Sequence, residues 1–275
     1  MKISMLFRFL FCAFAATTFL TVGAFAQTAP GQIRAAKVEG QVTKVQANGT
    51  TTALKNGDAL TETDSVLTGK NSSVVLVFAN GASVKVGPDS RLGIDEFKMD
   101  PLDEDIKPAE LKQEKNVSQT KLNLAYGEMV GSVRKLNTAS GYSIKTPVGA
   151  AGIRGTVFRV VFRPSPDGKA FYAVSTAEGK VVMTGVTANE IPVDADKEVL
   201  VDVDTDDAAN PKVVTRDLSD ETKALIDAAA KTIAEALQGM VIPPGGGTPP
   251  PSETQEQQDP TDAAPDLTPG AGNSH

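Results

Sequence analysis

The 275-residue sequence contains one cysteine, one histidine and no tryptophan. The cysteine, Cys12, lies in an N-terminal segment that we expect to be cleaved off, so the mature protein has no thiol for a disulfide, a zinc-thiolate site or a cysteine nucleophile. The histidine is His275, the last residue, and a Ser-His-Asp triad, a histidine–metal cluster or a histidine general base would have to use it. We therefore predict a protein that is not an enzyme and holds no cofactor and no metal.

Aromatic residues are also scarce. Only five phenylalanines and three tyrosines follow residue 26, and Phe78, Phe158 and Phe162 lie in apolar runs that a core would use. Paired carboxylates are abundant enough for a glycosidase, but sugar-processing clefts usually need aromatic platforms, which disfavours that activity. The 27 basic and 34 acidic residues give a net charge of −7, which disfavours nucleic-acid binding.

The N-terminus has the pattern of a secretory signal. Lys2 and Arg8 accompany an apolar run at Phe9–Val22, which ends at a small-x-small site before Ala26. The run is too short for a membrane-spanning helix. We predict a signal peptide over residues 1–26, cleavage between Ala26 and Gln27, and no membrane span afterwards. Cleavage removes two cations and no acid, so the net charge changes from −7 to −9. An exported protein without cysteine is typical of the bacterial envelope, which predicts a periplasmic or extracellular location.

Residues 27–218 predict a body made of strands. Short apolar or alternating runs recur every eight to twelve residues, and no long helical pattern interrupts them. Asn80-Gly81 separates the runs Val74–Ala79 and Ala82–Val86 and predicts a hairpin with a type I′ turn. Glycine precedes a strand at Gly40, Gly127 and Gly179, where it would relieve a sharp corner as the chain enters a new sheet. The fold class is therefore all-β, either solenoid-like or a twisted β-sandwich.

Three segments depart from this pattern. The charged insert 98–119 predicts a long hairpin excursion with a helical turn near Ala109–Lys115. Residues 219–242 predict one C-terminal α-helix, with Ser219 as N-cap and an apolar stripe that packs on the body; the stripe consists of Ile226, Ala229, Ile233, Leu237 and Val241. Residues 243–275 contain eight prolines, five acids and no Lys or Arg, the composition of a disordered tail.

Two clusters resemble ligand sites. Asp202, Asp204 and Asp206 begin like a calcium loop, but the glycine and the final glutamate of an EF-hand are missing; their alternation is more typical of an exposed strand edge protected by charge. Residues 149–156 contain a GxxG pair, Gly152 and Gly155, without the Lys-Ser/Thr ending of a phosphate loop and without a basic surround, and a strand follows them instead of a helix. We interpret this segment as a tight turn between two strands.

The same segment carries a family resemblance. Thr146–Val160 is similar to the hallmark of the FecR-type periplasmic domain, and shorter motifs match that family in the same order along about Ile33–Gly185. These motifs are Gly40–Val42, Leu54–Leu60, Asp64–Gly69, Ser73–Phe78 with Asn80–Val84, Pro88–Leu92 and Tyr126–Met129.

The resemblance implies a β-rich module that works by protein contact. Regulators of this family receive a signal outside the inner membrane and pass it to a sigma factor through a cytoplasmic segment. Because no such segment precedes the apolar run here, we expect a stand-alone exported version that contacts an unidentified envelope protein through strand edges or the insert. The alternative is a scaffold that binds cell wall or exopolysaccharide. The residues expected to matter structurally are Gly149, Gly152, Arg154, Gly155 and Thr156: the glycines permit the turn, and the Arg154 and Thr156 side chains hydrogen-bond open backbone groups.

Overall fold

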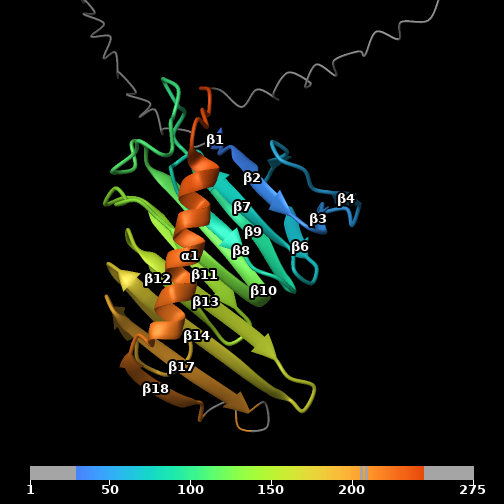
Figure 1. Ribbon diagram of the computed structural model, residues 1–275. Helices are drawn as coiled ribbons and strands as arrows, with labels where there is room; N and C mark the ends of the chain where they lie inside the picture. The colour runs from blue at the N-terminus through green and yellow to red at the C-terminus, as the bar shows by residue number, and fades with distance from the viewer. Residues whose placement is uncertain (1–28, 205–206, 208–209, 245–275) are drawn as a thin grey trace, which may run out of the picture.

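The computed structural model describes residues 29–204, 207 and 210–244 (Figure 1). The predicted signal peptide, its cleavage site at Ala26 and Gln27, and nearly all of the predicted tail 243–275 lie outside these residues.

The strands form two sheets, which we name sheet A and sheet B. Sheet A has the order β4-β3-β6-β9-β10-β11-β12-β15-β16, and β1 pairs with β9 beyond the end of β6. All its pairs are antiparallel except β10–β11. Its strands are β1 (Ala29–Pro30), β3 (Val42–Val45), β4 (Thr51–Ala53), β6 (Ser65–Thr68), β9 (Ser90–Met99), β10 (Ser118–Ser132), β11 (Gly141–Thr146), β12 (Gly149–Ile153), β15 (Lys180–Thr184) and β16 (Ile191–Asp194).

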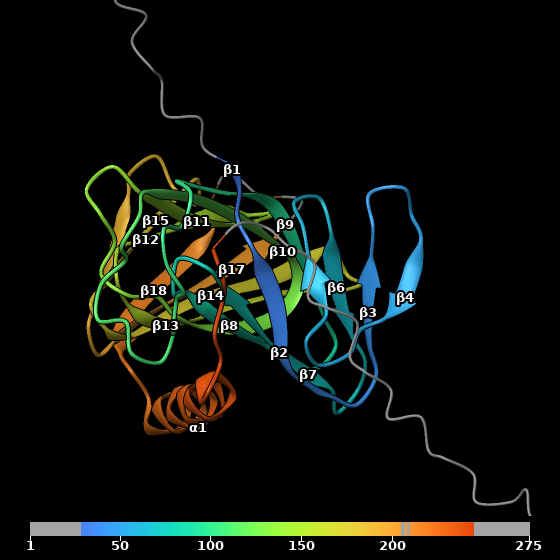
Figure 2. The ribbon, with the colours of Figure 1, turned by 90° about the horizontal axis from the view of Figure 1, so that it is seen from above.

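Sheet B is antiparallel throughout, with the order β5-β2-β7-β8-β10-β13-β14-β17-β18. Besides the shared β10, it contains β2 (Ile33–Glu39), β5 (Ala59–Leu60), β7 (Ser73–Phe78), β8 (Ser83–Val86), β13 (Val157–Pro164), β14 (Lys169–Glu178), β17 (Lys197–Asp204) and β18 (Lys212–Asp217). The two sheets lie in separate layers (Figure 2). One cluster of buried side chains from both sheets fills the space between them, so the predicted all-β fold is confirmed, in its twisted-sandwich form.

The chain crosses from one sheet to the other at the three predicted glycine corners. Residues 118–126 of β10 pair with β9 in sheet A, and residues 127–132 pair with β8 and β13 in sheet B. Gly127, at the switch, has a φ of +100°, while Gly40 and Gly179, between sheet B strands and the sheet A strands that follow, have φ of +73° and +81°. Side chains rarely adopt this backbone conformation, so the prediction of glycine at the corners is confirmed.

The predicted helix is present as α1 (Asp220–Leu237), and it ends five residues before the predicted boundary at residue 242. Ser219 is the N-cap, and its side chain accepts a hydrogen bond from the Thr222 amide. The helix packs against β8, β10 and β13, on the outer face of sheet B (Figures 1 and 2). Four of the five stripe residues are buried. Val241 is the exception: it lies past the helix end and is 44% exposed.

The β7–β8 hairpin is present, but its turn differs from the prediction. Gly81 has a φ of +86°, and Asn80 is not among the residues with positive φ. The Phe78 amide donates to Ala82 O at 2.9 Å, and the Gly81 amide donates to Phe78 O at 2.9 Å. This pattern is that of a three-residue loop with glycine in the left-handed position. The Asn80 side chain connects the turn to β10, because its Nδ2 donates to Ser118 Oγ at 2.9 Å.

The charged insert is a hairpin excursion between β9 and β10, as predicted, but it contains no helical turn at 109–115; a turn at Lys107–Glu110 stands there instead. Its interior packs on the body. Ile106 and Ile242 exchange two backbone hydrogen bonds of 2.8 Å, which joins the insert to the segment after α1. Glu114 is 2% exposed; it accepts hydrogen bonds from Ser118 Oγ and from the Asn137 amide.

The predicted acidic strand edge is wrong. Asp202 and Asp204 lie on β17, which is paired on both sides, with β14 and β18. The outermost strand is β18, so the alternating acids face solvent from the sheet surface and do not protect an edge. Asp206 lies outside the described residues. Within the part of the chain that the structure describes, no helix is both long and apolar enough to cross a membrane.

Candidate functional site

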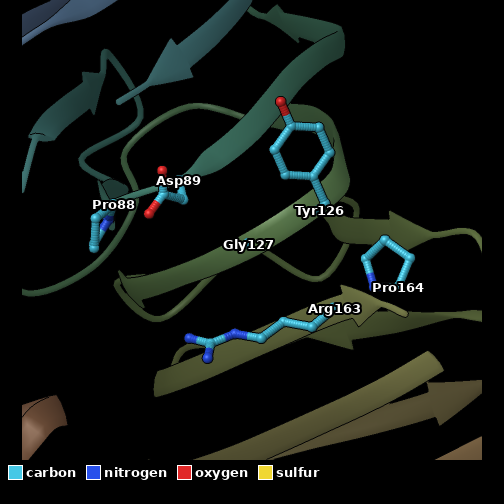
Figure 3. Close-up of a pocket in the computed structure, with 6 residues that line it drawn as sticks. All are labelled: Pro88, Asp89, Tyr126, Gly127, Arg163 and Pro164. Atoms are coloured by element: carbon cyan, nitrogen blue, oxygen red, sulfur yellow. The ribbon is translucent and has the colours of Figure 1, made fainter. Parts of the chain in front are cut away.

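A pocket of about 480 Å³ lies where the chain crosses between the two sheets. Figure 3 shows Pro88 and Asp89 on one side of the β10 ribbon at Gly127, with Arg163 and Pro164 on the other. Pro88 and Asp89 connect β8 of sheet B to β9 of sheet A. Tyr126 precedes the glycine corner of β10, so three separate segments of the chain meet at this pocket.

The walls of the pocket are held by hydrogen bonds at the crossing. Ser90 Oγ donates to Pro88 O at 2.8 Å and accepts from the Glu128 amide at 3.0 Å. Ser90 packs so closely on Gly127 that a Cβ at this glycine would overlap it. Asp89 has a φ of +47°, which a non-glycine residue seldom adopts and which surrounding structure must enforce. The backbone on two sides of the pocket is therefore tied together by hydrogen bonds at the crossing.

The Glu128 carboxylate holds the two arginine side chains beside the pocket in place. Glu128 Oε2 accepts from Arg159 Nη2 at 2.7 Å and from Arg163 Nη2 at 3.0 Å. Arg159 is 14% exposed and Arg163 is 62% exposed, so the second guanidinium is positioned by Glu128 while most of it faces solvent. Tyr126 is 38% exposed. Arginine and tyrosine, which both line this pocket, are enriched at energetically important positions in protein interfaces.

The sequence marks these segments only as motifs of the family resemblance. Pro88–Leu92 and Tyr126–Met129 are two separate motifs of the resemblance, and Arg163 belongs to none of the motifs. The spacing of about forty residues between motifs carries no sign that they meet, because the meeting is produced by the pairing of β10 with both sheets. The glycine corner at Gly127 was the one sequence signal at this place.

The five residues singled out from sequence lie elsewhere, and they do not form one turn. Gly149 and Gly152 are in strand β12, so the turn is confined to residues 154–156. The Arg154 side chain is exposed and Thr156 is 2% exposed. The hydrogen bonds expected from these two side chains are absent in the described part of the chain, where Thr156 Oγ1 has no partner. The Thr156 carbonyl instead accepts from the Val133 amide at 2.9 Å.

Gly155 is constrained by its surroundings. Its φ is +84°, and a Cβ there would lie 2.9 Å from the Cα of Lys135 and 3.3 Å from Arg134 O. At Gly152 the φ is ordinary, and the nearest atom to a Cβ would be Val182 O at 3.7 Å. The two glycines of the GxxG pair therefore have different reasons to be present, and only Gly155 is required by backbone conformation.

No set of three or more His, Cys, Asp or Glu side chains that could hold a metal ion is found in residues 29–204, 207 and 210–244. Another pocket, of about 590 Å³, is lined by Asp202, Asp204 and Asp207 among others. These carboxylates line a surface that also carries Arg163, Lys169 and Lys212, so their charge is balanced.

Comparison with known proteins gives one family and a distant fold similarity. Residues 64–182 match the family described as FecR protein. Two crystal structures of a candidate anti-sigma factor from Parabacteroides distasonis ATCC 8503, at 2.50 and 1.65 Å, are 12% and 14% identical to this chain, each with a TM-score of 0.41. Each alignment covers 58% of this chain and 62% or 64% of the other, so the chain spans less than two thirds of their length. No curated protein matches the sequence.

Proposed function

We propose, from the premise that this chain carries a FecR-type domain at residues 64–182, that it is a non-enzymatic interaction module that senses or relays signals in the bacterial cell envelope. It acts after export, in the periplasm or outside the cell, by binding an envelope protein. It acts by molecular recognition, and the single cysteine and single histidine of the sequence agree with this, because they leave little scope for a thiolate nucleophile or an imidazole base.

The observation that supports this proposal is the pocket at the crossing between the sheets, which we name the Tyr126–Arg163 pocket after two of its lining residues. A sensing module needs a surface that keeps its shape before the partner arrives, because ordering costs then do not reduce affinity. Glu128 orients Arg163, and the crossing between the sheets fixes Tyr126. The two prolines that line the pocket, Pro88 and Pro164, restrict its backbone further.

Site-specific photo-cross-linking tests the proposal. A photoreactive phenylalanine analogue replaces Tyr126 in the signal-cleaved protein, which is then irradiated in envelope extract of the native bacterium. We expect one discrete adduct, and about a tenfold lower yield with Arg163→Glu, because losing an interface arginine costs roughly 1–2 kcal/mol. The matched control carries the analogue at Leu225 on α1, which is 46% exposed. Identical adducts at both positions, or no adduct at 126, would refute the proposal.

A further inference from the structure

The outer face of sheet A contains a groove that the Tyr126–Arg163 pocket does not involve. One part, about 460 Å³, is lined by Lys121, Ser143, Lys145, Gly149 and Ala150 among others. A second part, about 280 Å³, shares Lys121 and Ser143 and continues to Gly152 and Arg154. The two parts therefore form one trough along β11. The strands that line the trough, β11 and β12, belong to the layer opposite to the one that α1 covers (Figure 2).

The trough exists because β11 and β12 present small side chains outward. Tyr142 and Ile144 point into the core and are at most 4% exposed, so alternation along the strand turns Gly141 and Ser143 outward. The register pairs Ser143 with Gly152 and Lys145 with Ala150. Glycine, alanine and serine thus make the floor. From Gly141 to Lys145 on β11, four residue steps of roughly 3.3 Å each, the floor is about 13 Å long.

Cations stand at both ends of the floor. Lys145 and Arg154 are exposed, and in the described part of the chain neither side chain has a hydrogen-bond or ion-pair partner. Lys121, between them, is paired with Glu96 at 2.7 Å; the hydrogen bond to Lys121 lowers the pKa of Glu96 below its ordinary value. Asp95 is the one acid among the lining residues. On a protein of net charge −7, this is a locally cationic surface, contrary to the sequence-based view that the GxxG pair has no basic surround.

We infer that this trough binds an extended acidic segment of a partner protein. Arg154 lies four residues beyond Ala150, the register partner of Lys145, so the two cations are about 13 Å apart along the strand direction. An extended peptide with acids at every fourth residue matches that spacing. A sugar polymer fits less well, because no aromatic side chain points out of the floor to stack on a sugar ring. The site is independent of the Tyr126–Arg163 pocket.

Fluorescence anisotropy of a labelled peptide that repeats Glu-Ser-Gly-Ser tests the inference on the signal-cleaved protein. We expect saturable binding that weakens with added salt, since both cations are exposed, and no binding of the matching Gln-Ser-Gly-Ser peptide. The double variant Lys145→Glu, Arg154→Glu should lose affinity by about tenfold or more. Gly152→Leu should block the trough while leaving the fold intact, because a Cβ at this position meets nothing closer than 3.7 Å.

The matched control changes the same charge elsewhere, with Lys55→Glu and Lys231→Glu, both exposed and outside the trough. An equal loss in this control would show general charge attraction and overturn the site. Tighter binding of oligogalacturonate at the same cations would assign the trough to an acidic sugar polymer. Tighter binding of a peptide with the sequence of residues 252–266 would assign it to the chain's own acidic segment. Either result would overturn the assignment to a partner protein. Circular dichroism of each variant excludes loss of the fold as the cause.

Discussion

The carboxylate of Glu198, on β17, accepts a hydrogen bond from Arg216 Nε, on β18, at 2.9 Å, and Glu198 is only 2% exposed. The same side chain accepts from the Ser219 amide at 3.3 Å and from Ser175 Oγ at 3.3 Å. One buried acid therefore connects the last two strands of sheet B to the N-cap of α1.

Glu198→Ala should lower the free energy of unfolding by about 2–3 kcal/mol, because hydrogen bonds to a charged group are lost and the Ser219 amide loses its partner. Urea unfolding measures the loss, and hydrogen exchange should show the first turn of α1 opening more often. Glu198→Gln is the milder control, because its amide oxygen still accepts a hydrogen bond and its volume is nearly unchanged. Equal effects of the two variants would contradict this role of Glu198.

Gly155→Val should destabilise the protein by roughly 1–3 kcal/mol, because a branched side chain is forced into a left-handed conformation. The Cβ contact of 2.9 Å with the Cα of Lys135 adds to the strain. Gly152→Ala, where a Cβ has room, should change stability by less than about 1 kcal/mol. Thermal melting of both variants checks the contrast, and a wild-type melting temperature for Gly155→Val would disprove the structural role of this glycine.

Ile106→Ala and Ile242→Ala should each cost about 2–5 kcal/mol, since both side chains are at most 2% exposed. Because the antiparallel bridge places these two side chains side by side, the double variant should lose less than the sum of the two single losses, with a coupling of about 0.5–3 kcal/mol. Val241→Ala, at a position 44% exposed, serves as control and should be nearly neutral. If the loss of unfolding free energy in the double variant equals the sum of the two single losses, the insert and the segment after α1 are energetically independent.

Alkaline pH should destabilise the protein through its buried tyrosines. Burial raises the pKa of Tyr142 and of Tyr172 above the ordinary value near 10. Above about pH 10 the unfolded chain releases these protons while the folded protein retains them, so the free energy of unfolding falls as the pH rises further.

Tyr172→Phe should reduce that fall. It should also keep or raise stability at pH 7 by about 1 kcal/mol, because in the described part of the chain the Tyr172 hydroxyl is buried without a hydrogen-bond partner. Tyr126→Phe, at an exposed tyrosine, should leave the pH profile as it is. Denaturant titrations at pH 7 and above pH 10 measure the free energy of unfolding of each variant. If that free energy falls with pH as steeply in Tyr172→Phe as in the wild type, Tyr172 does not contribute to the alkaline destabilisation.

Local patterns predicted the elements that depend on neighbouring residues. The α1 helix follows from a cap at Ser219, acids in the first turn and four buried stripe residues, all of which lie within a few turns of one another. The turn at Asn80-Gly81 was placed correctly but given the wrong type, because the Asn80 side chain bonds to Ser118, a residue that no local rule connects to it. The helical turn in the insert was wrong because Ile106 pairs with Ile242 and Glu114 is buried in a distant hydrogen-bond network.

The amino-acid sequence by itself determined the strand-rich class, the glycine corners and the scarcity of cysteine and histidine, because composition, alternation and backbone freedom are properties of single residues and their neighbours. Which strands became partners was decided only by the tertiary structure. The division of β10 between two sheets brings Asp89, Tyr126 and Arg163 to one pocket, and the register of β11 on β12 sets Lys145 and Arg154 at the two ends of a trough. These residues come together through the pairing of strands that are distant in the sequence, and local sequence patterns do not specify which strands pair.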